Sequence, residues 1–322
     1  MPATLIQAHL DAFSQQRRIR ASSLIISVFG DAIHPRGGRI WLGSLIRLLQ
    51  PLGVGERLIR TTVFRLAQDG WLRTEAFGRR ADYLLTPAGQ HRIEDAARHI
   101  YASSTPVWDR RWRLMLVVGD IASRQREQLR RALFWQGFGL LGADCFIHPS
   151  ADLDAASDAL MADGLGDLLQ ELMSLLAVEN HFGNSARDVD MVLRAWNLEQ
   201  LGNDYASFVA RYRPLIEVLR QNQGDIISDE TAFLLRTVLI HEYRRLLLRD
   251  PELPAELLPH DWPGNEARLM CREFYRRLLQ SSERHLDQHL QCANGHVPPA
   301  QALLQQRFQT EDPFQDLPRT TP

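Results

Sequence analysis

The spacing of apolar residues changes from helical to alternating within one short N-terminal stretch of the chain. The expected elements are a strand over Arg39 to Leu42, a helix over Gly43 to Leu49, a second helix over Gly55 to Gln68, and alternating runs over Trp71 to Phe77 and Ala81 to Leu85. Pro51 and Gly53 break the first helix, and Gly78-Arg79-Arg80 forms the turn between the alternating runs. Helix, turn, helix and hairpin in this order predict a winged helix-turn-helix.

The second helix of this motif divides into an apolar side and a basic side. At about 100° per residue, one side collects Ile59, Thr62, Val63 and Leu66, and the other collects Arg57, Arg60, Thr61 and Arg65. The planar guanidinium of Arg fits guanine edges and phosphates, so the basic side suits a major groove. We expect base contacts from Arg57, Arg60 and Thr61, and mostly phosphate contacts from Arg65, Arg79 and Arg80. Phe64 also points to the basic side, where it would meet a thymine methyl group or another domain.

Charge is distributed unevenly along the chain, although the formal net charge is only -2. From Arg17 to Arg98 there are 14 Arg and 7 acidic residues, whereas from His99 to Pro322 there are 23 Arg and 31 acidic residues. Only the end that carries the predicted motif is basic, which favours a nucleic-acid partner there. The alternative is an Arg-rich helix face that is merely solvated, but the strand, both helices and the basic hairpin in register argue against it.

Length and composition indicate a soluble protein with more than one domain. With 322 residues, 45% of them hydrophobic, the chain can bury a large core and fits two or three domains. Its widely spaced cysteines, Cys145, Cys271 and Cys292, suit a reducing cytoplasm. Neither a signal peptide nor an apolar run of roughly 20 residues is visible, so we expect a cytoplasmic protein with no membrane partner.

The segments around the motif predict a support helix and a connector. Met1 to Arg20 is polar and expected to be frayed, whereas Ala21 to His34 has helical apolar spacing and should pack behind the motif. Thr86-Pro87 is typical of an N-cap and first helical residue, and opens a connector helix to about Tyr101. Ser103 to Pro106 marks a domain boundary.

After Arg110 strands and helices alternate. The expected elements are a strand over Trp112 to Val118, a helix over Gln125 to Trp135, a strand over Gly139 to His148 and a helix over Asp152 to Met161. Leu172 to Phe182 fits either a strand or a helix, and a strand would complete a small ferredoxin-like sheet. We expect this domain to pair with a second copy, because a helix-turn-helix reads two half-sites as a dimer; binding a ligand alone is the alternative.

Beyond Ser185 the pattern is helical. The expected helices cover Ala186 to Leu193, Leu198 to Gln221, Asp229 to Leu248 and Gly264 to Leu279. Four prolines make Asp250 to Pro263 an extended crossing, whose Trp262 is placed to wall a pocket. Asn294 to Pro322 is rich in Gln, Pro and Thr and is expected to be a loose tail.

Four stretches together resemble the phenylacetic acid degradation operon repressor (PaaX) family. They are RGGRIWLGSLIRLLQPLGVGERLIRTTVFRLAQDGWL, RRALFWQGFGLL, RYRPLI and LIHEYRRLLLRDPELPAELLPHDWPGNEARLMCREFYRRL. The resemblance runs from about Ser22 to Leu279 in similar order and spacing. It implies an α+β chain with a winged-helix DNA-binding domain at 21–101, a ferredoxin-like dimerisation domain similar to the small CRISPR-associated endoribonucleases at 107–183 and an all-α effector domain at 186–282. The chain after Leu279 does not share the resemblance, and the flexible tail expected at 294–322 follows from its composition.

The resemblance also implies a repressor that binds a double-stranded DNA operator as a homodimer and is released by phenylacetyl-coenzyme A. We expect no cofactor. Coenzyme A needs guanidinium groups and a flat surface, and an arylacetyl group needs an apolar slot. The candidate effector residues, expected between the winged helix and the C-terminal domain, are Tyr243, Arg244, Arg245 and Trp262. The alternative is that these arginines pair with acids and Trp262 is core. A related aromatic-acid pathway with another acyl-CoA effector is also open.

Signals for catalysis or metal binding are weak. His241-Glu242 begins like a zincin motif, but Arg245 stands where the second histidine is needed. Asp120 follows the first middle-domain strand, where a nuclease of similar fold would place a metal ligand, yet a single Asp is more often a turn residue. A zinc site is a further alternative, because four potential ligands have helical spacing: His285, His289, Cys292 and His296. A polar surface is the simpler interpretation of this spacing. We therefore expect no enzyme; an acyl-CoA enzyme and a protein-binding winged helix are the less favoured alternatives.

Overall fold

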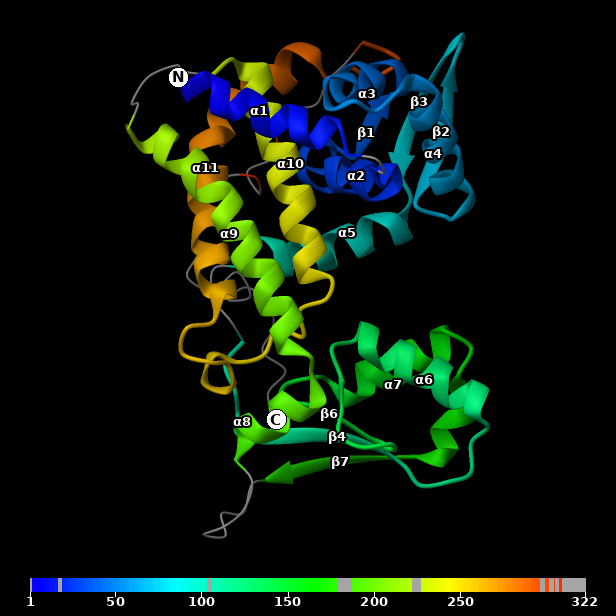
Figure 1. The fold of residues 1–322 in the computed structure, drawn as a ribbon. Helices are drawn as coiled ribbons and strands as arrows, with labels where there is room; N and C mark the ends of the chain where they lie inside the picture. The colour runs from blue at the N-terminus through cyan, green and yellow to red at the C-terminus, as the bar shows by residue number, and fades with distance from the viewer. Residues whose placement is uncertain are drawn as a thin grey trace. The chain divides into compact units, whose positions relative to one another are not determined.

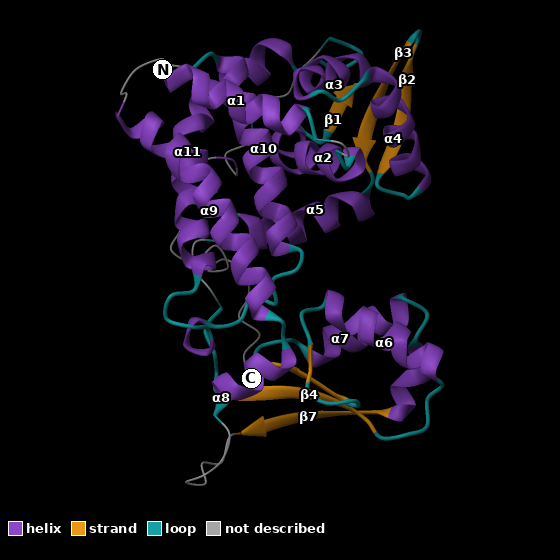
Figure 2. Cartoon of the chain, viewed as in Figure 1, coloured by secondary structure: helices purple, strands orange, loops and turns teal. Residues whose placement is uncertain are grey.

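The computed structural model describes residues 2–16, 19–102, 106–178, 187–221, 227–295, 299–300, 304 and 307–308. The chain divides into two compact units. The first unit consists of Met1–Ser103, Phe208–Arg244 and Asn265–Pro322, and the second of Ser104–Ser207 and Arg245–Gly264. Each unit combines helices with an antiparallel sheet (Figures 1 and 2), so the predicted α+β class is confirmed. The finer division into four segments stays a prediction.

The first unit holds the strand, helices and hairpin that the N-terminal pattern predicted. Its N-terminal helices are α1 (Pro2–Ser14), α2 (Ala21–Val28), α3 (Leu42–Leu49), α4 (Glu56–Gln68) and α5 (Pro87–Ile100). Its strands are β1 (Arg39–Trp41), β2 (Leu72–Phe77) and β3 (Arg80–Leu85), in the order β1-β3-β2. Strands β2 and β3 form a hairpin, and α4 lies beside it (Figure 1).

The N-terminal segment differs from the expectation of a frayed end. Residues 2–14 form α1, and Ile6, Leu10 and Phe13 are buried on one side of it. Their spacing of four and three residues is that of an amphipathic helix, which the polar residues between them obscured. Helix α1 packs on the turn between α3 and α4, where Gly53 has a φ of 78° and a side chain would come within 2.8 Å of the Ser14 carbonyl oxygen. The prediction of a frayed N-terminus was wrong.

The helix predicted over Ala21 to His34 is present but changes its winding. After α2, residues Phe29–Ile33 form a π-helical turn and His34–Arg36 a 3-10 turn. A π-helical segment inside a helix is uncommon and often marks a functional position. Here it places Asp31 in the interior of the unit.

Helix α5 begins as its sequence predicted. The Thr86 hydroxyl accepts a hydrogen bond from the Gly89 amide at 2.9 Å, which caps the first turn, and Pro87 occupies the first helical position. Ile93 and Ile100 are buried, so α5 also contributes to the core of the first unit. The connector helix is therefore packed rather than bare.

The second unit contains a four-stranded sheet covered on one face by helices. Its strands are β4 (Arg111–Val117), β5 (Gly139–Leu140), β6 (Cys145–His148) and β7 (Leu172–Val178), in the order β5-β6-β4-β7. Its helices are α6 (Ser123–Trp135), α7 (Leu153–Ala162) and α8 (Asp188–Ala195), with a 3-10 turn at Gly166–Glu171. The strand alternative for Leu172 onward is confirmed as far as Val178, and residues 179–182 lie outside the described residues. The strand predicted over Gly139 to His148 is instead two strands, because Gly142 turns the backbone at a φ of 80°.

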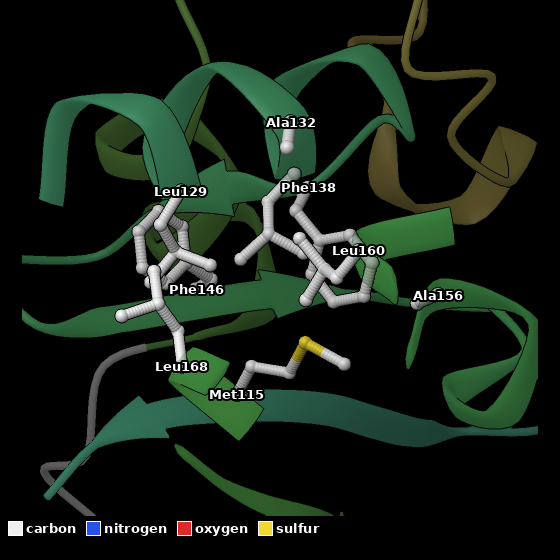
Figure 3. Packing of buried hydrophobic residues seen from close by; sticks show 9 residues of the cluster. Met115, Leu129, Ala132, Phe138, Phe146, Ala156, Leu160 and Leu168 are labelled. Atoms are coloured by element: carbon white, nitrogen blue, oxygen red, sulfur yellow. The ribbon is translucent and has the colours of Figure 1, made fainter. Parts of the chain in front are cut away.

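The core of the second unit lies between this sheet and helices α6 and α7. Figure 3 shows side chains from both layers meeting there, with Met115 and Phe146 from the sheet facing Leu129 and Leu160 from the helices. These four side chains are no more than 2% exposed. Met115 of β4 and Phe146 of β6 supply the buried sheet side of this core, and Val117 and Leu140 pack against it.

Three long helices complete the chain and contribute residues to both units. They are α9 (Leu198–Gln221), α10 (Asp229–Leu247) and α11 (Pro263–His289), and a 3-10 turn at Ala255–Leu257 interrupts the Pro-rich crossing. Helix α11 continues to His289, beyond the predicted end at Leu279. Three described residues of the segment predicted as a loose tail, Leu304, Arg307 and Phe308, are buried. No described helix has the length and apolar character needed to cross a membrane.

Candidate nucleic-acid interface and ligand site

Helix α4 presents a basic surface because its other side is fully used in packing. Ile59, Thr62, Val63 and Leu66 are buried, which fixes the rotation of the helix about its axis. Their spacing leaves the opposite side facing outward. All six residues predicted to contact DNA are exposed: Arg57, Arg60, Thr61, Arg65, Arg79 and Arg80.

These six residues differ in how they are held. Arg60 pairs with Glu56 one turn earlier at 2.7 Å, and both side chains are more than half exposed. The Thr61 hydroxyl donates to the Arg57 carbonyl at 2.9 Å, as threonines in helices commonly do. Within the described part of the chain, Arg57, Arg65 and Arg79 form no ion pair, so their charges face solvent.

Arg80 is held by an aromatic ring that the sequence pattern did not single out. Its guanidinium lies 4.5 Å from the centre of the Trp41 ring, and the guanidinium of Arg47 on α3 lies 5.1 Å from the same ring. Trp41 therefore gathers two cations at the start of α3, beside the hairpin. Arg47 is exposed and belongs to the same basic surface, which we define as Arg47, Arg57, Arg60, Arg65, Arg79 and Arg80. In the sequence, the only indication that Arg47 belongs to this surface was its charged side chain on the polar side of α3.

The chain after α11 is attached to the base of this surface. The Trp41 amide donates to the Gln291 carbonyl at 2.9 Å, and the Ser44 hydroxyl donates to the His289 carbonyl at 2.9 Å. The buried Asp82 carboxylate on β3 accepts from the Ala293 amide at 2.6 Å. Backbone groups of residues 289–293 thus hold β1, α3 and β3 by hydrogen bonds to the Trp41 amide and to the side chains of Ser44 and Asp82, and no local sequence pattern indicates this.

A buried carboxylate links the same two regions more deeply. Asp31, in the π-helical turn, is 3% exposed and pairs with Arg236 of α10 at 2.7 Å and with Arg307 at 2.9 Å. The hydroxyls of Tyr101 and Tyr275 donate to the same carboxylate at 2.6 and 3.0 Å. Five segments that are distant in sequence therefore meet at one side chain, within the first unit.

Ionisation in this cluster follows from its charges. Burial raises the pKa of Asp31, but the guanidiniums of Arg236 and Arg307 outweigh it, so the pKa lies below its ordinary value. Burial raises the pKa of Tyr275 to about 12, so this hydroxyl stays protonated and donates a hydrogen bond to the Asp31 carboxylate. Arg236 also binds Glu283, which in turn pairs with Arg36 at 2.6 Å. The Asp31 cluster, meaning Asp31 with Arg236, Arg307, Tyr101, Tyr275 and Glu283, is thus charged and hydrogen-bonded throughout.

The four candidate effector residues do not form one group within either unit. In the first unit, Tyr243 is buried against Phe208 with ring centres 5.7 Å apart, and the half-buried Arg244 donates to the Ser23 hydroxyl at 3.3 Å. Burial lowers the pKa of the Arg244 guanidinium. In the second unit, Arg245 is exposed and Trp262 is buried against Tyr205, with ring centres 5.9 Å apart. Tyr243 and Trp262 are thus core residues.

Two cavities bear on ligand binding, one in each unit. Arg244, Ser27 and Trp71 help to line a cavity of about 20 Å³ in the first unit, which has room for little more than one water molecule. The cavity in the second unit has a volume of about 300 Å³, at the lower end for a small-molecule site. Its lining combines aromatic and aliphatic side chains with two arginines, Arg130 and Arg249. Arg130 already pairs with Glu127, and Arg249 pairs with Asp204 at 2.8 Å.

The histidines weighed as metal ligands have other neighbours. His285 stacks on Phe233 with ring centres 5.2 Å apart and lies 4.5 Å from the ring of His289, while Cys292 donates to the Arg39 carbonyl at 3.7 Å. His296 lies outside the described residues. No group of three or more potential metal ligands occurs among the residues that the structure describes.

The basic helix surface, the hairpin beside it and the second sheet unit are features of a multidomain α+β protein whose N-terminal part carries an exposed basic surface. Family comparison is more specific: the chain belongs to the PaaX-like proteins. Residues 20–89 match the PaaX-like protein model, residues 105–181 the PaaX protein central Cas2-like domain, and residues 196–288 the PaaX-like protein C-terminal domain. The family resemblance seen in the sequence is confirmed.

Two known proteins are similar to this chain, one in sequence and one in fold. It is 36% identical to the transcriptional repressor PaaX of Escherichia coli (strain K12) over 305 residues, which cover 93% of this chain and 94% of that repressor. Its fold is similar to that of an uncharacterized protein from Mycobacterium tuberculosis, with a TM-score of 0.52, 22% identity, and coverage of 81% of this chain and 96% of the other. The second likeness concerns the fold alone.

Proposed function

We propose that this chain is a DNA-binding transcriptional repressor of phenylacetic acid catabolic genes, with a winged helix-turn-helix built from α3, α4 and the β2–β3 hairpin. The observation that carries the proposal is the basic surface on α4, whose rotation is fixed by four buried residues. A similar protein over nearly the whole chain is named a transcriptional repressor, which supports the same role. A cytoplasmic location follows from this role.

The inducer that we propose is phenylacetyl-coenzyme A, which would release the repressor from its operator. Exposed Arg245 and half-buried Arg244 are the proposed phosphate contacts. Tyr243 and Trp262 are buried, so they would contact the effector only through a change in packing. Release requires that the ligand bind more tightly to an arrangement that does not fit DNA, because a ligand of equal affinity for both states shifts nothing.

DNA binding is tested without knowing the operator. Duplexes bound by the full chain are selected from a random pool, and their affinity is measured by fluorescence anisotropy at several salt concentrations. We expect one enriched sequence that binds at least about 1,000-fold more tightly than the unselected pool at physiological salt. The logarithm of affinity should fall linearly with the logarithm of salt concentration. A pool that remains random after selection contradicts the proposed function.

The inducer is tested on the same complex. Phenylacetyl-coenzyme A should displace the selected duplex, whereas coenzyme A and phenylacetate alone should not. The variant Arg245→Ala, at an exposed position, should bind DNA like the parent and need a higher inducer concentration. Trp262→Phe keeps an aromatic ring in the core and tests whether this position senses the effector. If another aryl-acyl-CoA releases the complex better, the regulator serves a related aromatic-acid pathway.

A further inference from the structure

One apolar side chain lies in the middle of the basic surface. Phe64 on α4 is 59% exposed, although it is a large aromatic residue. It lies two residues from both Thr62 and Leu66, which are buried, and so points about 160° away from each of them around the helix. Phe64 is therefore aimed straight outward from the side of α4 that packs.

The neighbours of Phe64 are polar or basic. Arg60 and Thr61 precede it by one helical turn, and Arg65 follows it. The acid nearest along this side, Glu56, is already paired with Arg60. A second apolar helix docking here would cover these guanidiniums without offering them acceptors, which is costly. Charge complementarity instead favours a polyanion that also carries an apolar group.

The major groove of duplex DNA has this combination. Phosphates line its edges, guanine supplies acceptors, and thymine projects a 5-methyl group into the groove. A helix with its side chains is about 10–12 Å wide and the groove about 12 Å, so the residues at the centre of the outward side reach the bases. On α4 Arg57, Thr61 and Phe64 form this centre, and the long side chain of Arg60 lies next to it.

We propose that Phe64 reads a thymine through its 5-methyl group and is a specificity-determining residue of the repressor. This inference rests on the proposed function. A phenyl ring forms no strong hydrogen bond, so its contribution to base choice comes from burial of that methyl group. Phe64 then selects thymine over cytosine, while Arg57 and Arg60 read hydrogen-bonding groups at neighbouring base pairs.

The test removes the methyl group from DNA and the ring from the protein, separately and together. Each thymine of the selected duplex is replaced in turn by deoxyuridine, which lacks only the 5-methyl group. At one position in each half-site, the replacement should weaken binding of the parent about four-fold, as expected for losing burial of one methyl group. For Phe64→Ala the same replacement should have no effect, because the contact is already gone.

A matched control is available on the same helix. Leu58 is 46% exposed and lies off the centre of the outward side, so Leu58→Ala should keep the four-fold effect of deoxyuridine. Circular dichroism should show both variants folded, since neither side chain is buried. Suppose that the parent protein selects a sequence while deoxyuridine lowers the DNA affinity of the parent and of Phe64→Ala equally at every thymine. In that case the inference is wrong and the repressor function stands. If Phe64→Ala instead changes only the sedimentation coefficient, the ring is a protein contact and the inference is again wrong.

Discussion

Arg60 and Arg80 are both exposed on the basic surface, but their surroundings give them different roles. Arg60 is held by an exposed ion pair with Glu56, and such pairs contribute only about 0–1 kcal/mol. Its guanidinium can therefore leave Glu56 for a guanine at small cost. Arg80 lies over Trp41 at the hairpin, and we expect it to contact the DNA backbone there. Arg60 should specify sequence and Arg80 should not.

The first prediction separates these roles. Arg60→Ala should cost about 1–3 kcal/mol on the selected duplex and relax the sequence preference. Arg80→Ala should weaken selected and random DNA alike and reduce the salt slope by about one. Anisotropy titrations of both variants against both kinds of duplex measure this. As a control, Glu56→Gln removes a negative charge and should strengthen binding to both. Equal losses of Arg60→Ala on selected and random DNA would rule out its base contact.

His148 on β6 is a second residue whose environment fixes its chemistry. It is 7% exposed, and its Nδ1 accepts hydrogen bonds from the amides of Ser150 at 3.0 Å and Ala151 at 2.7 Å. An imidazole that accepts at Nδ1 must be neutral there. Burial lowers the pKa of His148 to about 4, and the charge of Arg113 acts in the same direction.

The second prediction is a loss of stability in mild acid. Because the folded-state pKa is below the ordinary value of about 6.5, the unfolded chain takes up the proton first as pH falls. The free energy of unfolding should therefore decrease between about pH 6.5 and 4, by up to about 3 kcal/mol from His148. Urea denaturation at pH 7.5, 5.5 and 4.5 measures it. His148→Asn keeps an acceptor without the titration and should show a shallower decrease; an unchanged decrease would exclude His148 as its source.

At the scale of elements, local patterns in the sequence located most helices and strands. The bounds of α9 were predicted residue for residue, and those of α4, α5, α6 and α10 to within a few residues, because their apolar spacing is regular. The outward side of α4 was predictable for the same reason. Where polar residues interrupt the apolar spacing, as in α1, the prediction failed. Helix α11 was ended too early because its last turns carry mainly polar and charged residues.

Contacts between distant elements were not predictable from local pattern. Asp31 and Arg236 are 205 residues apart and have no spacing that relates them. A buried carboxylate surrounded by arginines and tyrosines resembles a surface polar residue in the sequence. Arg307 lies in a segment rich in Gln and Pro, whose composition predicts no packing. Tertiary packing alone places these residues in the interior.

The third prediction concerns what the Asp31 cluster does for the elements it joins. Arg236→Met should destabilise the protein by about 3–5 kcal/mol, because it leaves buried Asp31 and partly buried Glu283 with one cation fewer. Arg307→Met should cost less, about 1–3 kcal/mol, since Asp31 keeps Arg236 while the Gly30 carbonyl loses a donor. Thermal and urea unfolding measure both.

The exposed pair of Arg277 with Glu273 supplies the comparison. Both side chains are more than 30% exposed, so Arg277→Ala should change stability by no more than about 1 kcal/mol. If Arg307→Met is as neutral as Arg277→Ala, the C-terminal segment does not stabilise the first unit. If the Arg307→Met protein is folded but binds DNA more weakly, the Asp31 cluster also orients α4.

At the scale of the whole molecule, the sequence identified the order of the parts better than their assembly. The family resemblance covers most of the chain, and all three family regions follow in the predicted order. Self-association is different, because it depends on which surfaces remain uncovered in the folded chain. Strand β7 is such a surface: it lies at one edge of the second sheet, without a charged residue or proline. Its exposed side chains include Met173, Leu176 and Val178.

The last prediction is that the protein is a two-fold dimer joined through this edge. Natural proteins protect an open apolar edge strand, and two copies of β7 side by side and antiparallel would satisfy each other's backbone groups. The opposite edge is the two-residue strand β5, where Gly139 is covered by Trp196, so it offers no comparable surface.

Sedimentation velocity at micromolar concentration should show a dimer, and Leu176→Lys at the 59% exposed position should shift it toward monomer. Two copies of α4 related by a two-fold axis bind two copies of the same half-site, so the selected operator should be an inverted repeat. The monomeric variant should lose affinity for the full repeat while binding a single half-site like the parent. A parent that sediments as a monomer, or a footprint on one unpaired half-site, would contradict the dimer.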